Sequence, residues 1–265
     1  MLSFNSLGNL GRLANQMFQY ASVKGIAMNR GYEFCIPPKD VFGNRDNNVR
    51  TSDVTIYDCF SLSEVKKSTI RNPLVQESGF HFDENIFTNC PDNVDLFGYF
   101  QSEKYFKHIE SDIRKDFTFN DNLLEICNSF VKENFPDTDI ISLHIRRGDY
   151  VSNPNHPVQT LDYYKEALNK MPNLPVIVFS DDHEWCKQQD LFSSDRFSVS
   201  EGNSTDADLC LMSLCNYHII ANSSFSWWGA WLAKSEKVVA PRNWFGGDCL
   251  TKNTKDLYLS DWEII

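Results

Sequence analysis

Hydrophobic and polar positions follow a regular pattern mainly in the second half of the chain. Short strand-like runs occupy residues 140–146, 176–180, 196–199, 217–221 and 238–240. Between them, apolar residues recur at helical spacing over residues 161–171, 183–190, 206–215 and 224–234. Strands that alternate with helices predict an α/β fold with a doubly wound parallel sheet.

The first half shows fewer elements. The pattern predicts a helix that runs from the Gly11 region to Arg30 and stops at Gly31. It also predicts strands at 32–36 and 95–100 and helices at 103–116 and 122–134, whereas residues 39–93 are irregular and polar. Phe135-Pro136-Asp137 ends the last of these helices. We therefore predict an N-terminal domain of residues 1–138 and a C-terminal domain of residues 139–265, with the last ~20 residues packing back on the first domain.

The stretch Ile141–Tyr150 joins a predicted strand to a polar turn. Strand alternation places Ser142, His144 and Arg146 on one face, and Ile141, Leu143, Ile145 and Arg147 on the other. Gly148 then turns the chain and leaves both arginines near Asp149. Ligands of open α/β sheets bind at the carboxyl ends of strands, and guanidinium groups bind phosphate or carboxylate bidentately. The stretch therefore predicts an anion site, with an ion pair to Asp149 that pins the loop as the alternative.

Two acidic clusters follow other predicted strands. Asp181, after the run 176–180, can accept hydrogen bonds from a ribose or a guanine edge; the alternative is helix capping by Ser180 or Asp181. Asp206 and Asp208 invite a metal-binding interpretation, but they open a helix, where residues two apart do not face each other. Capping and interaction with the helix dipole are favoured there, and Asp208 alone can still reach a nucleotide base.

A polar segment with hydroxyl groups precedes a tryptophan-rich helix. It consists of Asn222, Ser223, Ser224, Phe225 and Ser226. Serine hydroxyls and unpaired backbone N–H groups at a helix start form an anion site. The tryptophans at 227, 228 and 231 cannot all face water, so we expect them in the core rather than stacked on a sugar.

The glycine-led entry to the first helix is a weaker signal. Asn15 and Gln16 lie in its first turn, where backbone N–H groups point out of the helix end and can receive a phosphate or a sugar hydroxyl. A simple turn is the more common meaning of a glycine at this place.

Composition narrows the class of protein. The formal net charge of −11 argues against broad nucleic-acid binding, although a local basic pocket for a nucleotide is compatible with it. The eight cysteines form no CxxC pair and no zinc-like spacing, so we expect reduced thiols. No apolar run approaches the about 18 residues of a membrane span, and the N-terminus lacks a signal pattern. These features predict a cytoplasmic protein that can associate with the inner face of the membrane through a partner.

Five segments together resemble the bacterial α-1,2-fucosyltransferases, glycosyltransferase family 11. They are Gly11-Arg-Leu-Ala-Asn-Gln-Met-Phe-Gln-Tyr20, Gly98-Tyr-Phe-Gln-Ser-Glu-Lys-Tyr-Phe106, His144-Ile-Arg-Arg-Gly-Asp-Tyr-Val151, Phe179-Ser-Asp-Asp182 and Ile220-Ala-Asn-Ser-Ser-Phe-Ser-Trp-Trp-Gly-Ala-Trp-Leu232. The resemblance implies a two-domain, GT-B-like fold with the acceptor on the N-terminal domain and the GDP-sugar on the C-terminal domain. It implies inverting transfer of L-fucose from GDP-β-L-fucose to the 2-hydroxyl of a terminal galactose, in surface polysaccharide synthesis on a free or lipid-linked glycan. It also implies that no metal and no further cofactor is required.

Site roles follow as hypotheses from this resemblance and the patterns above. Arg146 contacts the β-phosphate, backed by residues 223–226, while Arg147 makes a structural ion pair. His144 orients Arg146, lines the pocket or is simply a structural histidine. Asp149 holds Arg146 or contacts the sugar. The general base is Asp149 or His156, or the phosphate takes the proton while Asn15 positions the acceptor.

One position departs from the family pattern, and two alternative functions stay open. The entry segment usually has a glycine where Ala14 stands, and alanine would be strained there if the position required a positive φ. A transferase of the same fold can move another sugar from another nucleotide, and a non-catalytic nucleotide- or glycan-binding module is the alternative outside the enzymes. Residues 39–93, which carry no clear pattern, are expected to shape the acceptor site.

Overall fold

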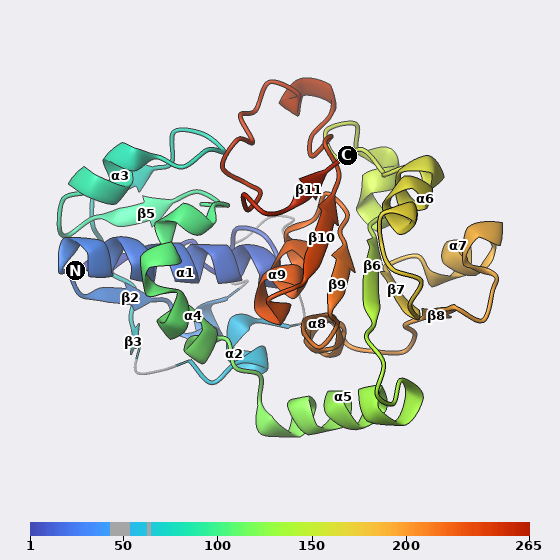
Figure 1. The fold of residues 1–265 in the computed structure, drawn as a ribbon. Coiled ribbons are helices and arrows are strands. Elements are labelled where there is room, and N and C mark those ends of the chain that lie inside the picture. Colours follow the sequence, from blue (N-terminus) through green and yellow to red (C-terminus); the bar gives the residue numbers. More distant parts are fainter. Residues whose placement is uncertain (43–53, 63–64) are drawn as a thin grey trace. The chain divides into compact units, whose positions relative to one another are not determined.

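The computed structural model describes residues 1–42, 54–62 and 65–265, so that residues 43–53 and 63–64 of the irregular stretch lie outside it. The chain forms two compact units, shown in Figure 1. The first consists of Met1–Asn120 with Asn253–Leu259, and the second of Asp121–Lys252 with Ser260–Ile265.

The first unit contains a five-stranded sheet in which every pairing is parallel. Its strands, in spatial order, are β3 (Lys66–Lys67), β2 (Phe34–Ile36), β1 (Leu2–Ser3), β5 (Asp95–Phe97) and β4 (Leu74–Gln76). The sequence pattern did not reveal β3 and β4, because they are short and mostly exposed and therefore carry no apolar run.

The helices of the first unit are α1 (Leu13–Arg30), α2 (Ile56–Cys59), α3 (Glu84–Asn89) and α4 (Glu110–Asp116). Helix α1 ends as predicted, since Gly31 adopts a left-handed φ of 68° and its N–H bonds to carbonyls of the last turn. The single helix predicted over 103–116 is wrong in its first half, which forms two 3-10 turns before α4. Phe106 breaks the helical conformation with φ −133° and is completely buried, with its ring 6.4 Å from that of Phe18 in α1.

The division between the units falls 18 residues before the predicted boundary at 138/139, because α5 (Asp121–Asn134) belongs to the second unit. Cys127 of α5 is buried, and its thiol donates to the carbonyl of Ala207 at 3.8 Å. Near the other end of the chain, only residues 253–259 join the first unit. There Asp256 accepts from the Phe82 N–H at 3.1 Å and pairs with the Lys104 ammonium at 2.6 Å.

The second unit contains a six-stranded, fully parallel sheet. Its strands, in spatial order, are β11 (Glu263–Ile264), β10 (Lys237–Ala240), β9 (Tyr217–Ile219), β6 (Ile141–Ile145), β7 (Val176–Ser180) and β8 (Phe197–Val199). The chain runs outward from β6 to β8 and then returns to β9 on the other side of β6. This reversal confirms the doubly wound sheet and places its topological switch point between β6 and β9.

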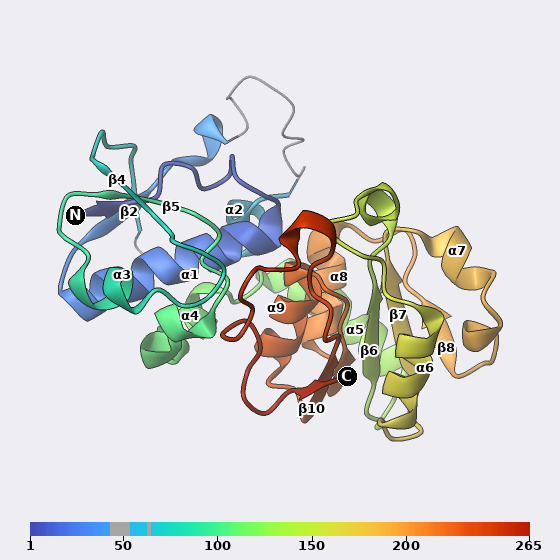
Figure 2. The same ribbon diagram turned by 90° about the horizontal axis from the view of Figure 1, so that it is seen from above.

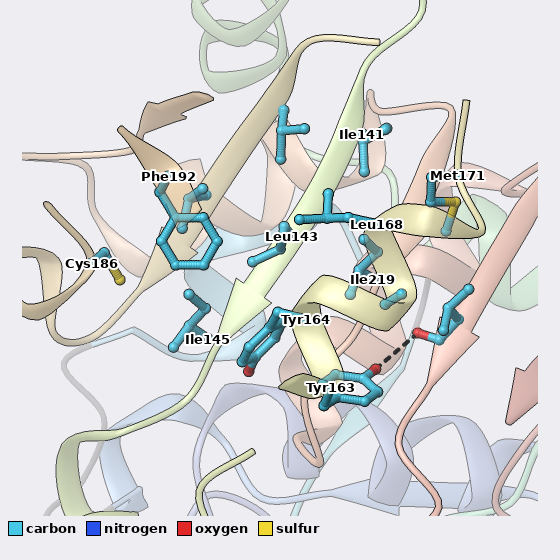
Figure 3. Packing of buried hydrophobic residues seen from close by; sticks show 14 residues of the cluster. Ile141, Leu143, Ile145, Tyr163, Tyr164, Leu168, Met171, Cys186, Phe192 and Ile219 are labelled. Atoms are coloured by element: carbon cyan, nitrogen blue, oxygen red, sulfur yellow. Dashed lines mark hydrogen bonds between the residues drawn. The ribbon is translucent and has the colours of Figure 1, made fainter. Parts of the chain in front are cut away.

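Helices cover both faces of this sheet, as Figure 2 shows from above. On one face, α6 (Leu161–Asn169) and α7 (His183–Lys187) pack on Ile141, Leu143 and Ile145 (Figure 3). On the other face lie α8 (Thr205–Ser213) and α9 (Ser224–Ala233). The tryptophans of α9, at 227, 228 and 231, are at most 2% exposed. The predicted strand alternation and the core role of the tryptophans are both confirmed.

Two further properties concern the whole described chain. All eight cysteines are free thiols, and seven of them are buried. Within the described ranges, no helix is long and apolar enough to cross a membrane.

Candidate functional site

Arg146 follows β6 directly, at the switch point of the second sheet. Its guanidinium pairs with Asp149 at 2.5 Å and with Asp181 at 2.8 Å, and lies 5.3 Å from the centre of the Tyr150 ring. The side chain of Asp149 is 56% exposed and that of Asp181 is 27% exposed. Of the two roles considered for Asp149, the structure shows the contact with the arginine.

Asp181 holds the loop that carries both arginines. In addition to Arg146, its carboxylate accepts from the backbone N–H groups of Arg147 at 2.8 Å and Gly148 at 3.2 Å. A Cβ atom on Gly148 would lie 2.4 Å from a carboxylate oxygen of Asp181, so this approach requires glycine. Asp181 thus binds the Arg146 side chain and two backbone N–H groups, and these contacts fix the backbone of the loop.

Arg147 points to the opposite face, as the alternation predicted. Its Nε donates to Asp182 at 2.9 Å, and its guanidinium stacks on the Trp185 ring at 4.0 Å. The hydrogen bond from Arg147 lowers the pKa of Asp182 below its ordinary value. Asp182 also caps α7 by accepting from the N–H of Trp185, so the cap predicted at Ser180 or Asp181 falls one residue later. The structural ion pair predicted for Arg147 is therefore confirmed.

His144 lies inside the sheet behind this loop. It is 5% exposed, its ring lies 5.7 Å from that of Phe225, and its Nδ1 has no hydrogen-bond partner among the described residues. Burial and, to a smaller extent, the charge of Arg146 together lower the pKa of His144 to about 3. The histidine is therefore neutral at physiological pH, and its buried position suits support of the site rather than proton exchange.

The serine segment contains capping, buried and half-buried groups. Ser223 caps α9, because its hydroxyl accepts from the Phe225 N–H at 3.3 Å. Ser226 is buried, and its hydroxyl donates to the carbonyl of Ser223 at 3.3 Å. Ser224 and Phe225 are half-buried at the start of the helix. A helix start beside the carboxyl end of β9 can bind an anion through N–H groups.

Asn222 is expected at the ligand but is 1% exposed in this structure. Its side-chain amide donates to the carbonyls of Pro157 and Trp244, both at 3.0 Å, and its Oδ1 has no partner among the described residues. The backbone carbonyl of Asn222 accepts from the Tyr150 hydroxyl at 3.2 Å. Asn222 thus ties together the loops that follow β6, β9 and β10.

His156 lies in the same set of loops. Its ring stacks on that of Tyr150 at 5.0 Å and meets that of Phe245 edge-on at 5.5 Å. Burial lowers its pKa, with a further contribution from Lys252, which keeps the imidazole neutral and able to accept a proton.

The predicted acidic pair lies at the start of α8. Asp206 and Asp208 lie in its first turn, as predicted, and the Ser200 hydroxyl donates to Asp208 at 2.7 Å. Burial raises the pKa of Asp208 above its ordinary value. In the part of the chain that the structure describes, no group of three or more His, Cys, Asp or Glu side chains is placed to hold a metal ion.

The first unit has a polar cluster at the start of α1. The Oδ1 of Asn15, which is half-buried, accepts from the Nε2 of Gln101 at 2.7 Å. Gln16, expected at the ligand, is 1% exposed, and its Oε1 accepts from the N–H of Ile56 at 3.2 Å, at the start of α2. Ala14 lies within α1, so its helical φ tolerates alanine without strain.

Sequence reasoning did not select three residues that shape these sites. Gln101 and Tyr150 lie inside motifs that were recognised, so their positions carried a usable signal. Trp185 lies in a predicted helix, where an aromatic residue is more often core. The pattern shows which residues follow a strand, but it does not show which of their neighbours bind them.

Comparisons with known proteins concern the family and the fold of the chain. The chain matches the model of glycosyl transferase family 11 over residues 3–265. It is 33% identical to an α-1,2-colitosyltransferase of Escherichia coli, over 89% of this chain and 90% of that protein. It is 27% identical to the galactoside 2-α-L-fucosyltransferase SEC1 of Bos taurus, over 86% of this chain and 64% of that protein. A crystal structure of NodZ α-1,6-fucosyltransferase soaked with GDP-fucose has a TM-score of 0.57 at 14% identity, covering 93% of this chain and 96% of NodZ. The shared fold confirms the GT-B-like architecture.

Proposed function

The chain belongs to glycosyl transferase family 11, and we propose that it transfers L-fucose with inversion from GDP-β-L-fucose to the 2-hydroxyl of a terminal galactose. The observation that carries this proposal is the position of Arg146 at the switch point, where open α/β sheets bind their ligands. The names of the relatives, an α-1,2-colitosyltransferase and a galactoside 2-α-L-fucosyltransferase, support the linkage and the acceptor.

On the donor side, Arg146 stabilises the leaving group. When the bond between C1 of the sugar and the phosphate oxygen breaks, negative charge grows on the β-phosphate. Arg146 is already balanced by two carboxylates, so a diphosphate has to replace one of them. Asp149 is the exposed partner and yields its place, while Asp181 keeps the loop in position. Ser224 and the start of α9 add hydrogen-bond donors.

On the acceptor side, the first unit contributes neutral amides. The acceptor hydroxyl attacks C1, GDP leaves, and the hydroxyl proton must be accepted by another group. Asn15 positions the acceptor, with its amide held by Gln101. The proton goes to a phosphate oxygen of the departing GDP, or to the neutral His156 as the alternative base. The galactose-terminated acceptor is a free or lipid-linked glycan.

Charge neutralisation by arginine and helix N–H groups makes a metal unnecessary in this scheme. We expect fucosyl transfer to proceed at the same rate in EDTA. A strict requirement for Mn²⁺ in the same assay would instead favour metal assistance by Asp206 and Asp208.

A second candidate differs only in the sugar. The relative from Escherichia coli is named for colitose, which is fucose without its 3-hydroxyl group, and it is 33% identical to this chain. The same phosphate site and the same linkage would serve a GDP-colitose donor.

A donor and acceptor panel tests the proposal. GDP-fucose, GDP-colitose, GDP-mannose and UDP-galactose are each incubated with lactose and N-acetyllactosamine, and the product linkage is determined by NMR. We expect an α-1,2-linked fucose on galactose. Transfer from GDP-colitose alone would establish the second candidate, and binding of GDP-fucose without transfer or hydrolysis would favour a non-catalytic module.

A further inference from the structure

Glu77, directly after β4 in the first unit, is a carboxylate that forms no ion pair with any described residue. Its Oε2 accepts from the backbone N–H groups of Tyr99 at 3.0 Å and Phe100 at 2.9 Å. Its Oε1 is buried and has no hydrogen-bond partner among the described residues, and no described cation pairs with the carboxylate. Buried carboxylates are normally paired, so this arrangement calls for a reason.

The backbone that Glu77 holds has an unusual shape. Gly98 has a φ of 153°, and Phe100 has a φ of 51°, which is rare for a residue with a large side chain. A Cβ atom on Gly98 would lie 2.6 Å from the Cβ of Glu77. The Ser102 N–H bonds to the Phe100 carbonyl at 2.8 Å and so closes a tight turn around Gln101. Two successive N–H groups that point at one oxygen form an anion-binding turn, which the Glu77 carboxylate fills.

This turn carries a side chain that hydrogen-bonds to the side chain of Asn15. Gln101 is 7% exposed, and its Nε2 donates to the Asn15 Oδ1 at 2.7 Å. The Asn15 Nδ2 donates to no described residue, so Gln101 fixes the orientation of an amide that still has donors to offer.

We infer that Glu77 is a positioning residue for the acceptor, because it holds residues 98–101 in the shape that aims Gln101 at Asn15. This inference rests on the proposed function, which assigns the acceptor to Asn15. Glu77 itself does not touch the substrate. It acts through two hydrogen bonds to the backbone and then through the amide pair.

Ionisation of Glu77 supports this role. Burial, with a smaller contribution from the nearby Asp83, raises its pKa to about 7, against the two backbone hydrogen bonds that lower it. Besides Asp83, Tyr105 is a titratable group near Glu77, and its hydroxyl accepts from the Asp83 N–H. The ionised carboxylate is the stronger acceptor for the two N–H groups.

The test compares four variants under one assay with GDP-fucose and N-acetyllactosamine. Glu77→Ala, Gln101→Ala and the double variant remove the two steps separately and together, and the exposed Glu84→Gln serves as a control carboxylate. We expect Glu77→Ala and Gln101→Ala each to lower kcat/KM for the acceptor by about 10–10²-fold, while the affinity for GDP stays within about twofold. The double variant should be little worse than either single variant, since both remove the same interaction.

A conservative variant separates positioning from folding. Glu77→Gln keeps an oxygen acceptor for the two N–H groups, so it should retain most of the acceptor kcat/KM. Protonated Glu77 also keeps a carbonyl oxygen, so the wild-type kcat/KM for the acceptor should fall, as pH decreases through about 7, only to the level of Glu77→Gln, and Glu77→Gln should lack that inflection.

Three results would overturn the inference: unchanged acceptor kinetics in Glu77→Ala, an equal loss of GDP affinity, or fully additive losses in the double variant. If Glu77→Ala fails to fold, an unaltered pH profile in Glu77→Gln would overturn it as well. A wild-type protein that transfers no fucose would instead contradict the proposed function, and the same comparison then uses whichever donor the panel identifies.

Discussion

The carboxyl ends of the two sheets differ in how their charged groups are paired. In the second unit, two arginines meet three carboxylates, and the bond from Arg147 lowers the pKa of Asp182. In the first unit, the amides of Asn15 and Gln101 pair with each other, Glu77 has no cation among the described residues, and burial raises its pKa to about 7.

This difference matches the two partners of the proposed reaction. A site of exchangeable ion pairs suits a charged diphosphate, which can replace one carboxylate without leaving an unpaired charge. A site of oriented amides suits a neutral hydroxyl group, whose position matters more than its charge. Four substitutions or measurements, taken from the largest expected effect to the smallest, test whether one site acts on the diphosphate and the other on the acceptor.

Arg146→Ala should have the largest effect. Removing a donor that meets developing charge lowers kcat by about 10²–10³-fold, and the protein should remain folded because Arg147 and Asp181 still hold the loop. Steady-state kinetics with GDP-fucose and N-acetyllactosamine measure the change, and circular dichroism checks the fold. Near-wild-type turnover would remove Arg146 from its catalytic role.

Asn15→Ala should lower the acceptor kcat/KM by about 10–10²-fold and leave the KM for GDP-fucose unchanged, because the amide acts only on the acceptor. The same initial-rate experiment with either substrate varied gives both constants. Gln16→Ala is an unsuitable control, because the Gln16 side chain accepts a hydrogen bond from the start of α2. The control is therefore Asn9→Ala, in the loop before α1. A similar rise in the KM for GDP-fucose would contradict the assignment of Asn15 to the acceptor alone.

The stability of the protein should depend on pH through Glu77. Its pKa in the folded state, about 7, lies above the ordinary value of 4.5, so the folded state binds the proton more tightly than the unfolded chain. The resulting stabilisation, on the order of 1–3 kcal/mol, is fully present below pH 4.5 and is lost as pH rises through 7. Urea unfolding of wild type and Glu77→Gln from pH 4.5 to 8 measures it. We expect the variant to lack this decline, and equal slopes in both proteins would contradict the assignment.

Asp149→Asn should have the smallest effect. It removes the exposed carboxylate that competes with the diphosphate for Arg146, and exposed ion pairs contribute only about 0.2–1 kcal/mol. GDP should therefore bind up to about fivefold more tightly, as measured by calorimetry. Weaker binding of GDP-fucose, with GDP binding unchanged, would show instead that Asp149 contacts the sugar.

The fold of the second unit could be predicted because its central strands β6 and β7 are buried on both faces. An apolar run such as the first four residues of β7 is visible in the sequence, and so is the arginine pair that follows β6. In the first unit, β3 and β4 were not predicted, because β3 is a pair of exposed lysines and β4 has only one half-buried residue. Strands of this kind are defined by their neighbours in the sheet and carry little pattern of their own.

The sites show the same limit. Strand alternation correctly separated Arg146 from Arg147, because a period of two residues is a local property. It did not predict that Gln16 and Asn222 are buried, since that depends on Ile56, Pro157 and Trp244, which are distant in sequence. Glu77 gave no signal at all, because its importance comes from a turn more than twenty residues away.

The most direct test of the division between the two sites is the binding of GDP to three proteins: wild type, Arg146→Ala and Asn15→Ala. Isothermal titration calorimetry measures the affinity without a sugar acceptor and without turnover. The account predicts that Arg146→Ala loses at least about tenfold in affinity, since a charge-assisted bidentate contact is removed, while Asn15→Ala binds GDP as the wild type does. Wild-type affinity in Arg146→Ala, or an equal loss in Asn15→Ala, would contradict it.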